Sequence, residues 1–260
     1  MKINKHNEEI DTNQKHWDAK PVLRMIYRSF HERIAASITR RINGSVVELG
    51  SGIGNIKEVI PDCIRTDLFS RPWLDQTENA YALKCSSGSL SNIILFDVFH
   101  HLEYPGTALR EFFRVLSPGG RVLIFDPCLS LLGLLVYGVF HPEAVALFKP
   151  LQWFAPLGWS PKEQCYYASS SQATRVFLMP KYRPLLSQWR VHSINKWTAL
   201  EYILSGGYSK PQIYPTRALP LFCRISQYMD VCPALFSTRM LAVLEKPDIS
   251  SDQSAVVVQE

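Results

Sequence analysis

The sequence predicts an α/β fold with a mostly parallel, doubly wound sheet, and three observations lead to this prediction. A mostly apolar run at 46–49 is followed by glycines at alternate positions. Two further short apolar runs, at 92–96 and 121–125, are each followed by an aspartate. A helical pattern of apolar residues at 105–116 separates these two runs. Strands that alternate with helices are typical of a parallel sheet covered on both faces.

The segment 46–60 predicts a strand, a glycine loop and a helix in succession. Val46, Val47 and Leu49 favour a buried strand, because β-branched and large apolar side chains pack well on a sheet. Glycines at 50, 52 and 54 allow a tight turn and the close approach of a ligand. Apolar residues at 53, 56 and 60 have helical spacing, so we expect a helix over 53–60. Such a unit binds its ligand at the carboxyl end of the strand.

One acidic residue and one missing glycine indicate the ligand of this loop. A dinucleotide loop of the form Gly-x-Gly-x-x-Gly requires glycine at position 55, where this chain has Asn55. Glu48 stands two residues before the first glycine, where its carboxylate would repel a pyrophosphate. S-adenosylmethionine suits this acid, because it carries an ammonium and a sulfonium but no phosphate. Residues 48–54, Glu-Leu-Gly-Ser-Gly-Ile-Gly, resemble the first motif of the class I S-adenosylmethionine-dependent methyltransferases.

The resemblance to this family extends over 45–127 and returns at the C-terminus. It is carried by the run at 96–102, Phe-Asp-Val-Phe-His-His-Leu, and by the run at 114–124, Arg-Val-Leu-Ser-Pro-Gly-Gly-Arg-Val-Leu-Ile. At 237–245 the sequence Ser-Thr-Arg-Met-Leu-Ala-Val-Leu-Glu is expected to form a closing strand. The resemblance implies a Rossmann-like sheet of seven mostly parallel strands, in which the last strand runs antiparallel to its neighbours.

The resemblance and the strand ends together assign a cofactor site for S-adenosylmethionine. Asp67, at the end of a strand expected over 64–68, would accept hydrogen bonds from the ribose hydroxyls, and a helix N-cap is its alternative role. Asn79 stands where the family carries an acid beside the adenine, and a turn residue is its alternative role. The predicted cofactor-binding residues are Glu48, Gly50, Ser51, Gly52, Gly54, Asp67, Asn79 and Asp97.

Two adjacent histidines, His100 and His101, are the candidate catalytic residues. They follow the strand expected over 92–96, beside the expected position of the methyl group, and histidine can accept a proton near neutral pH. His101 is the preferred base, and the alternative is that one ring only bonds a backbone carbonyl. The segment 141–143, His-Pro-Glu, is a second candidate for contact with the acceptor. No metal is predicted, because the histidines lack a companion carboxylate at ligand spacing.

The composition changes along the chain and predicts five parts. A helix is expected over 21–42, with a basic face that is solvated. The alternative, which the family resemblance implies, is that the helix closes over the cofactor and that Trp17, Arg24, Tyr27 or Arg28 caps it. Residues 128–214 hold 15 of the 30 aromatic side chains. The parts are a mobile N-terminal arm at 1–20, a cofactor-binding core with its cap helix at 21–127, an inserted substrate lid at 128–214, the C-terminal part of the core sheet at 215–246 and a disordered tail at 247–260.

Three bulky aromatic residues lie close together within the predicted lid. Trp153, Phe154 and Trp159 are too large for all of them to be buried in a small lid core. We therefore expect at least one of them to line the acceptor pocket, where an aromatic face can also attract a sulfonium. Most of the remaining aromatic residues would build the core of the lid itself.

Charge, cysteine usage and hydropathy limit the partners and the location. The net charge of +5, without a dense basic tract, argues against nucleic acid as a partner. The six cysteines show no paired or metal-ligand spacing, so we expect buried reduced thiols in a cytoplasmic protein. The longest uncharged apolar stretch, 128–140, is shorter than the ~20 residues that cross a bilayer. No integral membrane span is predicted, whereas peripheral contact with a membrane stays compatible with the sequence.

The sequence therefore predicts a methyltransferase that transfers a methyl group to a small-molecule, glycan or lipid-intermediate acceptor by O-methylation. Two alternatives come from other functional classes. A catalytically silent, methyltransferase-like binding module would keep the fold without cofactor affinity. A nicotinamide-dependent oxidoreductase is disfavoured by Asn55 and Glu48.

Overall fold

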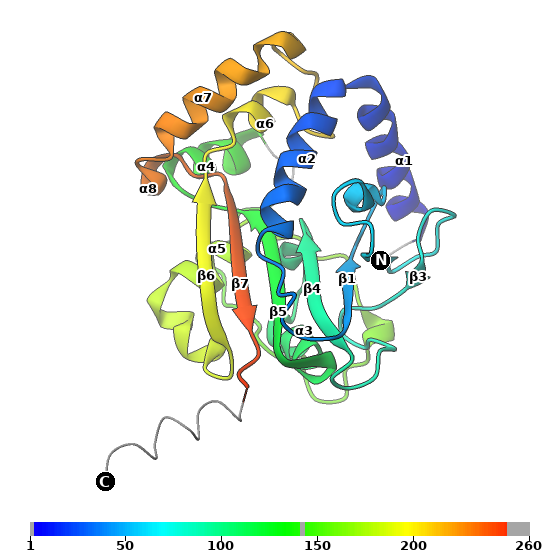
Figure 1. Cartoon of the computed structure of the whole chain (residues 1–260). Coiled ribbons are helices and arrows are strands. Elements are labelled where there is room, and N and C mark those ends of the chain that lie inside the picture. The colour runs from blue at the N-terminus through cyan, green and yellow to red at the C-terminus, as the bar shows by residue number, and fades with distance from the viewer. Residues whose placement is uncertain (1–2, 141–143, 249–260) are drawn as a thin grey trace.

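The computed structural model describes residues 3–140 and 144–248, which form one sheet covered by helices (Figure 1). Seven strands lie in the order β3-β2-β1-β4-β5-β7-β6. Neighbours from β3 to β5 pair in parallel, and β7 pairs antiparallel with both β5 and β6. This confirms the predicted fold with its antiparallel last strand. The strands are β1 (Ser45–Leu49), β2 (Ile64–Asp67), β3 (Gln76–Thr77), β4 (Leu90–Phe96), β5 (Leu116–Pro127), β6 (Arg190–Trp197) and β7 (Arg239–Glu245).

Helices cover both faces of the sheet. They are α1 (Ile3–Ala19), α2 (Pro21–Ala35), α3 (Pro105–Val115), α4 (Leu131–Leu135), α5 (Gln172–Leu178), α6 (Leu200–Ser205), α7 (Leu219–Met229) and α8 (Pro233–Phe236). The 3₁₀ turns are η1 (Asn55–Glu58), η2 (Phe99–His101), η4 (Pro161–Glu163), η5 (Pro180–Leu186) and η6 (Thr216–Ala218), and η3 (Val136–Phe140) is a π-helical turn that continues α4. No helix in the described ranges is long and apolar enough to cross a membrane.

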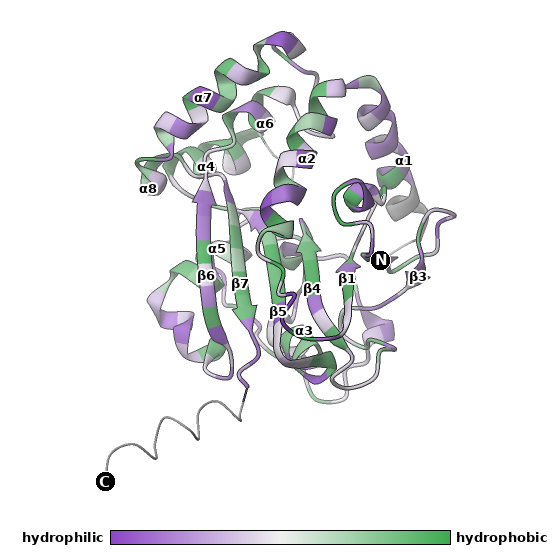
Figure 2. Ribbon diagram, viewed as in Figure 1, coloured by the Kyte–Doolittle hydropathy of each residue, from purple (hydrophilic) through white to green (hydrophobic). Residues whose placement is uncertain are grey.

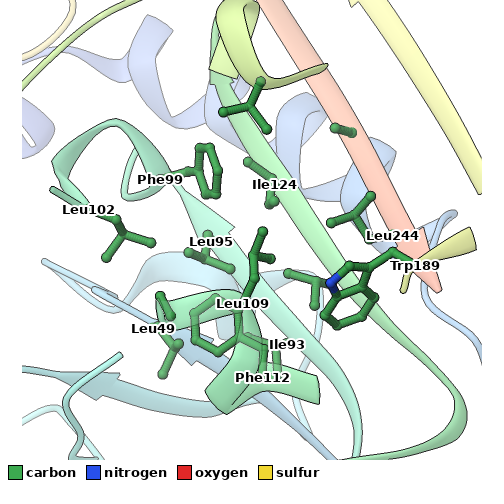
Figure 3. Close-up of a cluster of buried hydrophobic side chains, with 14 of the residues drawn as sticks. Leu49, Ile93, Leu95, Phe99, Leu102, Leu109, Phe112, Ile124, Trp189 and Leu244 are labelled. Carbon is green, nitrogen blue, oxygen red and sulfur yellow. The ribbon is translucent and has the colours of Figure 1, made fainter. Parts of the chain in front are cut away.

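Successive side chains of the central strands enter two different cores. Ile94, Leu123 and Val243 pack with α2, α6 and α7 on one face of the sheet. On the other face Ile93 and Ile124 pack with α3 and α5, as Figure 3 shows for part of this cluster. Because both faces are covered, the central strands are mostly apolar. They are therefore recognisable in the sequence as short apolar runs.

Two predicted helices are shorter than expected. α2 ends at Ala35 rather than at 42, because the chain then extends so that Thr39 can exchange two hydrogen bonds of 2.9 Å with the buried side chain of Asn92. The helix predicted over 53–60 is only the 3₁₀ turn η1. The left-handed φ of 72° at Gly54 excludes the first residues of the predicted helix, and Pro61 disfavours the helical region at Ile60, its last residue.

The structure contradicts a mobile arm for the described part of 1–20, because Ile3–Ala19 form α1. Ile10 and Trp17 lie seven residues apart, on one face of the helix, and both are buried. The indole of Trp17 packs edge-on against the ring of Tyr27 with a centroid distance of 5.8 Å. These two apolar side chains fix a helix whose overall composition is polar.

The prediction of a separate inserted lid at 128–214 needs correction, because two of its elements belong to the core. β6 pairs with β7 along its whole length, and α5 buries Ala173 and Val176 against the main cluster. β6 could not be recognised in the sequence because it is an edge strand whose residues are largely polar and partly exposed. The predicted contact at 141–143 and the part of the tail at 249–260 lie outside the described residues.

The prediction of buried thiols holds for only part of the cysteines. All six are free. Cys63 and Cys128 are buried, but Cys165 and Cys232 are exposed.

The side chain of Lys20 joins the N-terminal helices to the segment that follows α6. Lys20 is the residue between α1 and α2, its side chain is buried, and its ammonium donates hydrogen bonds to the backbone carbonyls of Ser205, Gly207 and Lys210. The carbonyls at the end of a helix have no partner within the helix, so a cation is favoured there. Lys20 therefore holds two distant segments of the chain against each other at the upper edge of the sheet.

We expect Lys20→Met to lower the free energy of unfolding by about 1.5–3 kcal/mol, the usual contribution of hydrogen bonds to a charged group. Methionine preserves the length of the side chain but leaves the carbonyls after α6 without their donor. Urea denaturation measures the effect, and Lys15→Met, at an exposed position of α1, is the matched control. Equal stability of the two variants would show that the Lys20 bonds do not hold the fold.

Candidate functional site

A cavity of about 730 Å³ lies at the carboxyl edge of the parallel strands. In Figure 1 the arrowheads of β4, β5 and β6 point to this edge, and α1, α4 and α6 lie beyond it. The wall includes the glycine loop, the ends of β2 and β4, the start of β7, and side chains from α1, α2 and the segment 202–213. All but one of the predicted site residues line this cavity, and the exception is Gly54. The residues that line it are Glu48, Gly50, Ser51, Gly52, Asp67, Asn79, Asp97, His100 and His101.

The glycine loop brings backbone close to the cavity at Gly50. This residue has φ 71°, and a Cβ built on it would lie 2.5 Å from a methyl group of Val98. The loop is fixed to β2 because the Gly52 amide donates a 3.1 Å hydrogen bond to Asp67 and the Thr66 amide donates one of 3.1 Å to the Ser51 hydroxyl. Any side chain at position 50 would therefore separate the loop from the segment that follows β4.

Gly54 has a structural role outside the cavity. Its amide donates a 2.7 Å hydrogen bond to the Ser51 carbonyl, and its φ of 72° closes the loop before η1. A Cβ at this position would meet the indole of Trp73 at 2.9 Å. The predicted direct contact of Gly54 with the cofactor therefore has no support from the cavity wall.

Glu48 places a buried carboxyl group at the bottom of the cavity. Its side chain is 3% exposed, and Oε2 has no hydrogen-bond partner among the described residues. The pKa of this carboxyl group is raised to about 7, mainly by burial and also by the nearby charge of Asp67, and a hydrogen bond with Ser51 opposes the shift. Near neutral pH the group therefore has an unused capacity to bind a positively charged ligand.

Asp67 and Asn79 form the neighbouring part of the wall. Asp67 accepts hydrogen bonds from the amides of Gly52 and Leu68, at 3.1 and 2.7 Å, and no helix begins between it and β3. The alternative role of Asp67 as a helix N-cap is therefore excluded. Asn79 accepts a 2.9 Å hydrogen bond from the Tyr81 amide and donates one of 3.4 Å to the Pro161 carbonyl, so its side chain supports a turn while it faces the cavity.

His100 is paired with a buried carboxylate at the end of β5. Its Nδ1 lies 2.9 Å from Oδ1 of Asp126, which is fully buried. Burial raises the pKa of Asp126, and the neighbouring His100 opposes this shift. The expectation that the histidines lack a companion carboxylate is therefore wrong.

Ligand atoms of Asp97, His100 and Asp126 all lie within 4.8 Å of one another, which is close enough for a metal site. The Arg239 guanidinium, however, already forms an ion pair with Asp97. This cation neutralises the outer carboxylate of the cluster, and we assign no metal to it.

The ring of His101 packs beside that of His100, with a centroid distance of 4.1 Å. Its Nδ1 lies 2.9 Å from the backbone carbonyl oxygen of Tyr167, which can only accept a hydrogen bond. His101 thus has the carbonyl contact that the sequence left as an alternative for one of the two histidines. Both rings line the cavity, and they differ in the group that holds them.

Sequence reasoning missed Arg239, which is buried at the start of β7. Its guanidinium carbon lies 4.5 Å from the centroid of the Tyr202 ring, and its Nη1 contacts Asp97. Because β7 runs antiparallel, its first residue reaches the edge where the parallel strands end. The predicted direction of the closing strand was the signal that could have identified Arg239.

The aromatic residues predicted for the pocket do not line the cavity. Trp153 covers Gly106, where a Cβ would lie 2.4 Å from its indole nitrogen, and Trp159 packs edge-on against two tyrosines of the α3 side. Phe154 is exposed beneath Arg110. The aromatic side chains in the cavity wall are Tyr27, Phe96, Tyr137, Phe140, Tyr166, Tyr167, Tyr202 and Tyr208.

Among the candidates for the cap, only Tyr27 reaches the cavity. Trp17 supports Tyr27 from α1. Arg24 and Arg28 are exposed and pair with Asp18 and Glu32.

Comparison with known proteins identifies the family. A family model described as a methyltransferase domain matches residues 23–177, which is more than half of the chain, and the chain belongs to this family. No curated protein matches the sequence. The resemblance to the class I S-adenosylmethionine-dependent methyltransferases is thereby confirmed.

The solved structures that are similar to this chain are distant from it in sequence. Geranyl diphosphate C-methyltransferase from Streptomyces coelicolor A3(2) superposes with a TM-score of 0.50 at 12% identity, over 84% of this chain and 78% of that chain. A chain from a Haloferax volcanii complex between a methyltransferase activator and a methyltransferase gives 0.49 at 13% identity, over 86% and 92%. The YcgJ protein from Bacillus subtilis gives 0.47 at 15% identity, over 84% and 98%.

We expect Glu48→Gln to remove a pH-dependent loss of stability from the ligand-free protein. The folded state binds the Glu48 proton more tightly than the unfolded state does, because its folded pKa is raised from 4.5 to about 7. The stabilisation by this proton is complete below pH 4.5 and is lost as the pH rises through 7, which amounts to on the order of 3 kcal/mol.

Urea denaturation at pH 5 and pH 8 tests this prediction. Glu48→Gln should match the parent protein at the lower pH and be more stable at the higher one. Glu58→Gln, at an exposed position nearby, should show no such difference. A constant offset for Glu48→Gln at both pH values would contradict the raised pKa.

Proposed function

We propose that this protein transfers a methyl group from S-adenosylmethionine to an oxygen of a small-molecule, glycan or lipid-intermediate acceptor. The observation that carries the proposal is that one cavity joins the glycine loop and its buried acid to the His100–Asp126 pair. The first part fits a cationic cofactor, and the second can accept a proton from a hydroxyl group. The wall of the same cavity also contains tyrosines and apolar side chains, which suits an acceptor with an apolar part.

The residues around the glycine loop fit S-adenosylmethionine in two observable respects. The unpartnered oxygen of Glu48 lies at the cavity, where it can accept from the ammonium group. Gly50 lines the cavity without a side chain, so its backbone can contact the ligand. Asp67 would accept from the ribose hydroxyls, Asn79 would lie beside the adenine, and Asp97 would complete the wall near the methionine part. Ser51 and Gly52 would contribute loop backbone.

When bound, the cofactor supplies an activated methyl group on its sulfonium. The protein mainly has to orient the acceptor oxygen and remove its proton, and orientation can contribute ~7–11 kcal/mol. Asp126 accepts the hydrogen bond from Nδ1 of His100, which makes Nε2 the proton-accepting nitrogen of the neutral ring. The imidazolium that forms is stabilised by the buried carboxylate. We therefore place the general base at His100, and His101 is the second candidate.

Calorimetry should detect binding of S-adenosylmethionine or S-adenosylhomocysteine with a micromolar Kd, equivalent to about −8 kcal/mol. Asp67→Ala should weaken this binding by roughly 1.5–3 kcal/mol, the range for hydrogen bonds to charged groups. Asp62→Ala, an exposed acid just before β2, is the control and should bind as the parent does. Preference for a nicotinamide dinucleotide would overturn the proposal, and absence of all binding would favour a silent binding module.

Turnover should depend on the His100–Asp126 pair once an acceptor has been found by screening for release of S-adenosylhomocysteine. His100→Gln should lower kcat by ~10²–10⁴-fold, the usual contribution of a general base. Asp126→Asn should also lower kcat, and it should shift the limb of the pH–rate profile that reports the histidine. Cofactor affinity should change little in either variant.

His101→Gln is the matched comparison for this test. If it removes the histidine limb while His100→Gln retains it, the base is His101 and the assignment to His100 is wrong. If neither histidine changes kcat, O-methylation by a histidine base is contradicted.

A further inference from the structure

The segment formed by α4 and η3 exposes an apolar surface to solvent. Residues 131–140 contain no charged side chain, and Figure 2 shows the hydropathy of this region. Leu131 is 65% exposed, Leu135 51% and Val139 66%, and Leu134 is also exposed. Their spacing places them on one side of a helical segment whose other side buries Gly133 and Tyr137. We call Leu131, Leu134, Leu135 and Val139 the apolar stripe.

The apolar stripe is continuous with the rim of the cavity. Val136 and Phe140 belong to the same segment and line the cavity, and Phe140 is 66% exposed. Ile213, from the segment after α6, also lines the cavity and is 71% exposed. The rim therefore presents large apolar side chains to the outside, and the surface beyond one side of it is apolar as well.

A second short helix extends this surface. The hydroxyl of Ser130, at the start of α4, donates a 3.0 Å hydrogen bond to the carbonyl of Leu235 in α8. The side chains of Leu235 and Val231 are exposed. The segment of α4 and η3, and α8 with the turn that precedes it, thus turn apolar side chains outward, whereas a water-facing surface normally carries polar groups.

We propose that the apolar stripe docks on the surface of a lipid bilayer and that the methyl acceptor is a lipid whose headgroup enters the cavity past Phe140 and Ile213. The lipid acceptor rests on the proposed function, whereas the docking on a bilayer does not. A helix with one apolar face can lie in the interface plane of a bilayer without crossing it.

Two observations favour a bilayer over a second copy of the chain. A second copy seated on the apolar stripe would lie beside the rim and obstruct the route into the cavity. The charge is also complementary to anionic headgroups, because the chain carries a net charge of +5 and the exposed Lys210 lies in the same rim. Basic residues near a membrane surface strengthen binding to anionic lipids.

Sedimentation of the whole 260-residue chain with vesicles tests the docking directly. The parent protein should sediment with vesicles of phosphatidylcholine and phosphatidylglycerol, and less with phosphatidylcholine alone. The double variant Leu135→Glu and Val139→Glu should lower the partition coefficient at least about tenfold, because both side chains leave the hydrocarbon and add negative charge. Neither residue lines the cavity.

Leu157→Glu is the matched control, because Leu157 is a fully exposed leucine on a loop beside Trp159 and outside the apolar stripe. It should bind vesicles as the parent does. The docking is overturned if the parent does not bind vesicles, or if the double variant binds them as well as Leu157→Glu does. It is also overturned if the parent is a dimer by analytical ultracentrifugation that the double variant converts to a monomer.

Two readouts on the same variants separate this proposal from the proposed function. Calorimetry with S-adenosylhomocysteine should give the same Kd for the parent and the double variant. Turnover of a hydroxylated lipid in vesicles should fall in the double variant, whereas turnover of a short-chain, water-soluble analogue should be retained. Vesicle binding without cofactor binding would overturn the proposed function alone, and equal losses with both acceptors would overturn the lipid route into the cavity.

Discussion

The register between β1, β4, β5 and β7 is the constraint on which the site depends. Parallel pairing aligns Leu49 with Leu95 and Phe96 with Phe125, so the residues that follow these strands emerge together at one edge. The antiparallel pairing of β7 brings Arg239 to the same edge, opposite Pro127. A shift of one residue in any of these pairs would turn the site residues toward the wrong face of the sheet. Backbone hydrogen bonding in the core therefore fixes the positions of the charged groups in the cavity.

The parts of the fold that were predictable are those in which local sequence and tertiary structure agree. Central strands are buried on both faces and appear as apolar runs, and glycines mark the loop because the backbone there adopts positive φ. The errors come from elements whose stability depends on a few distant contacts. Ile10 and Trp17 hold a helix that has the composition of a polar arm, and β6 has the composition of an exposed edge strand.

Site residues could be predicted where each belongs to the end of a single strand. Contacts between residues of different strands could not be predicted. Glu48, Asp67 and the glycine loop follow single strands, so their common location could be inferred. The contact of His100 with Asp126 spans 26 residues, and that of Asp97 with Arg239 spans 142. Such pairs require the strand order and the register before they can be proposed. The prediction that an aromatic residue of the lid lines the acceptor pocket failed for the same reason. Trp153 packs against Gly106 and Trp159 packs beside α3, and these contacts depend on the tertiary structure.

The buried ammonium of Lys20 has a consequence for the order of events during a catalytic cycle. It holds the junction of α1 and α2 against the backbone after α6, and these two segments form different walls of the cavity. Neither wall can move outward alone without leaving carbonyl groups unpaired. In the catalytic cycle that we propose, release of the spent cofactor would therefore require the Lys20 hydrogen bonds to break first, before either wall moves outward.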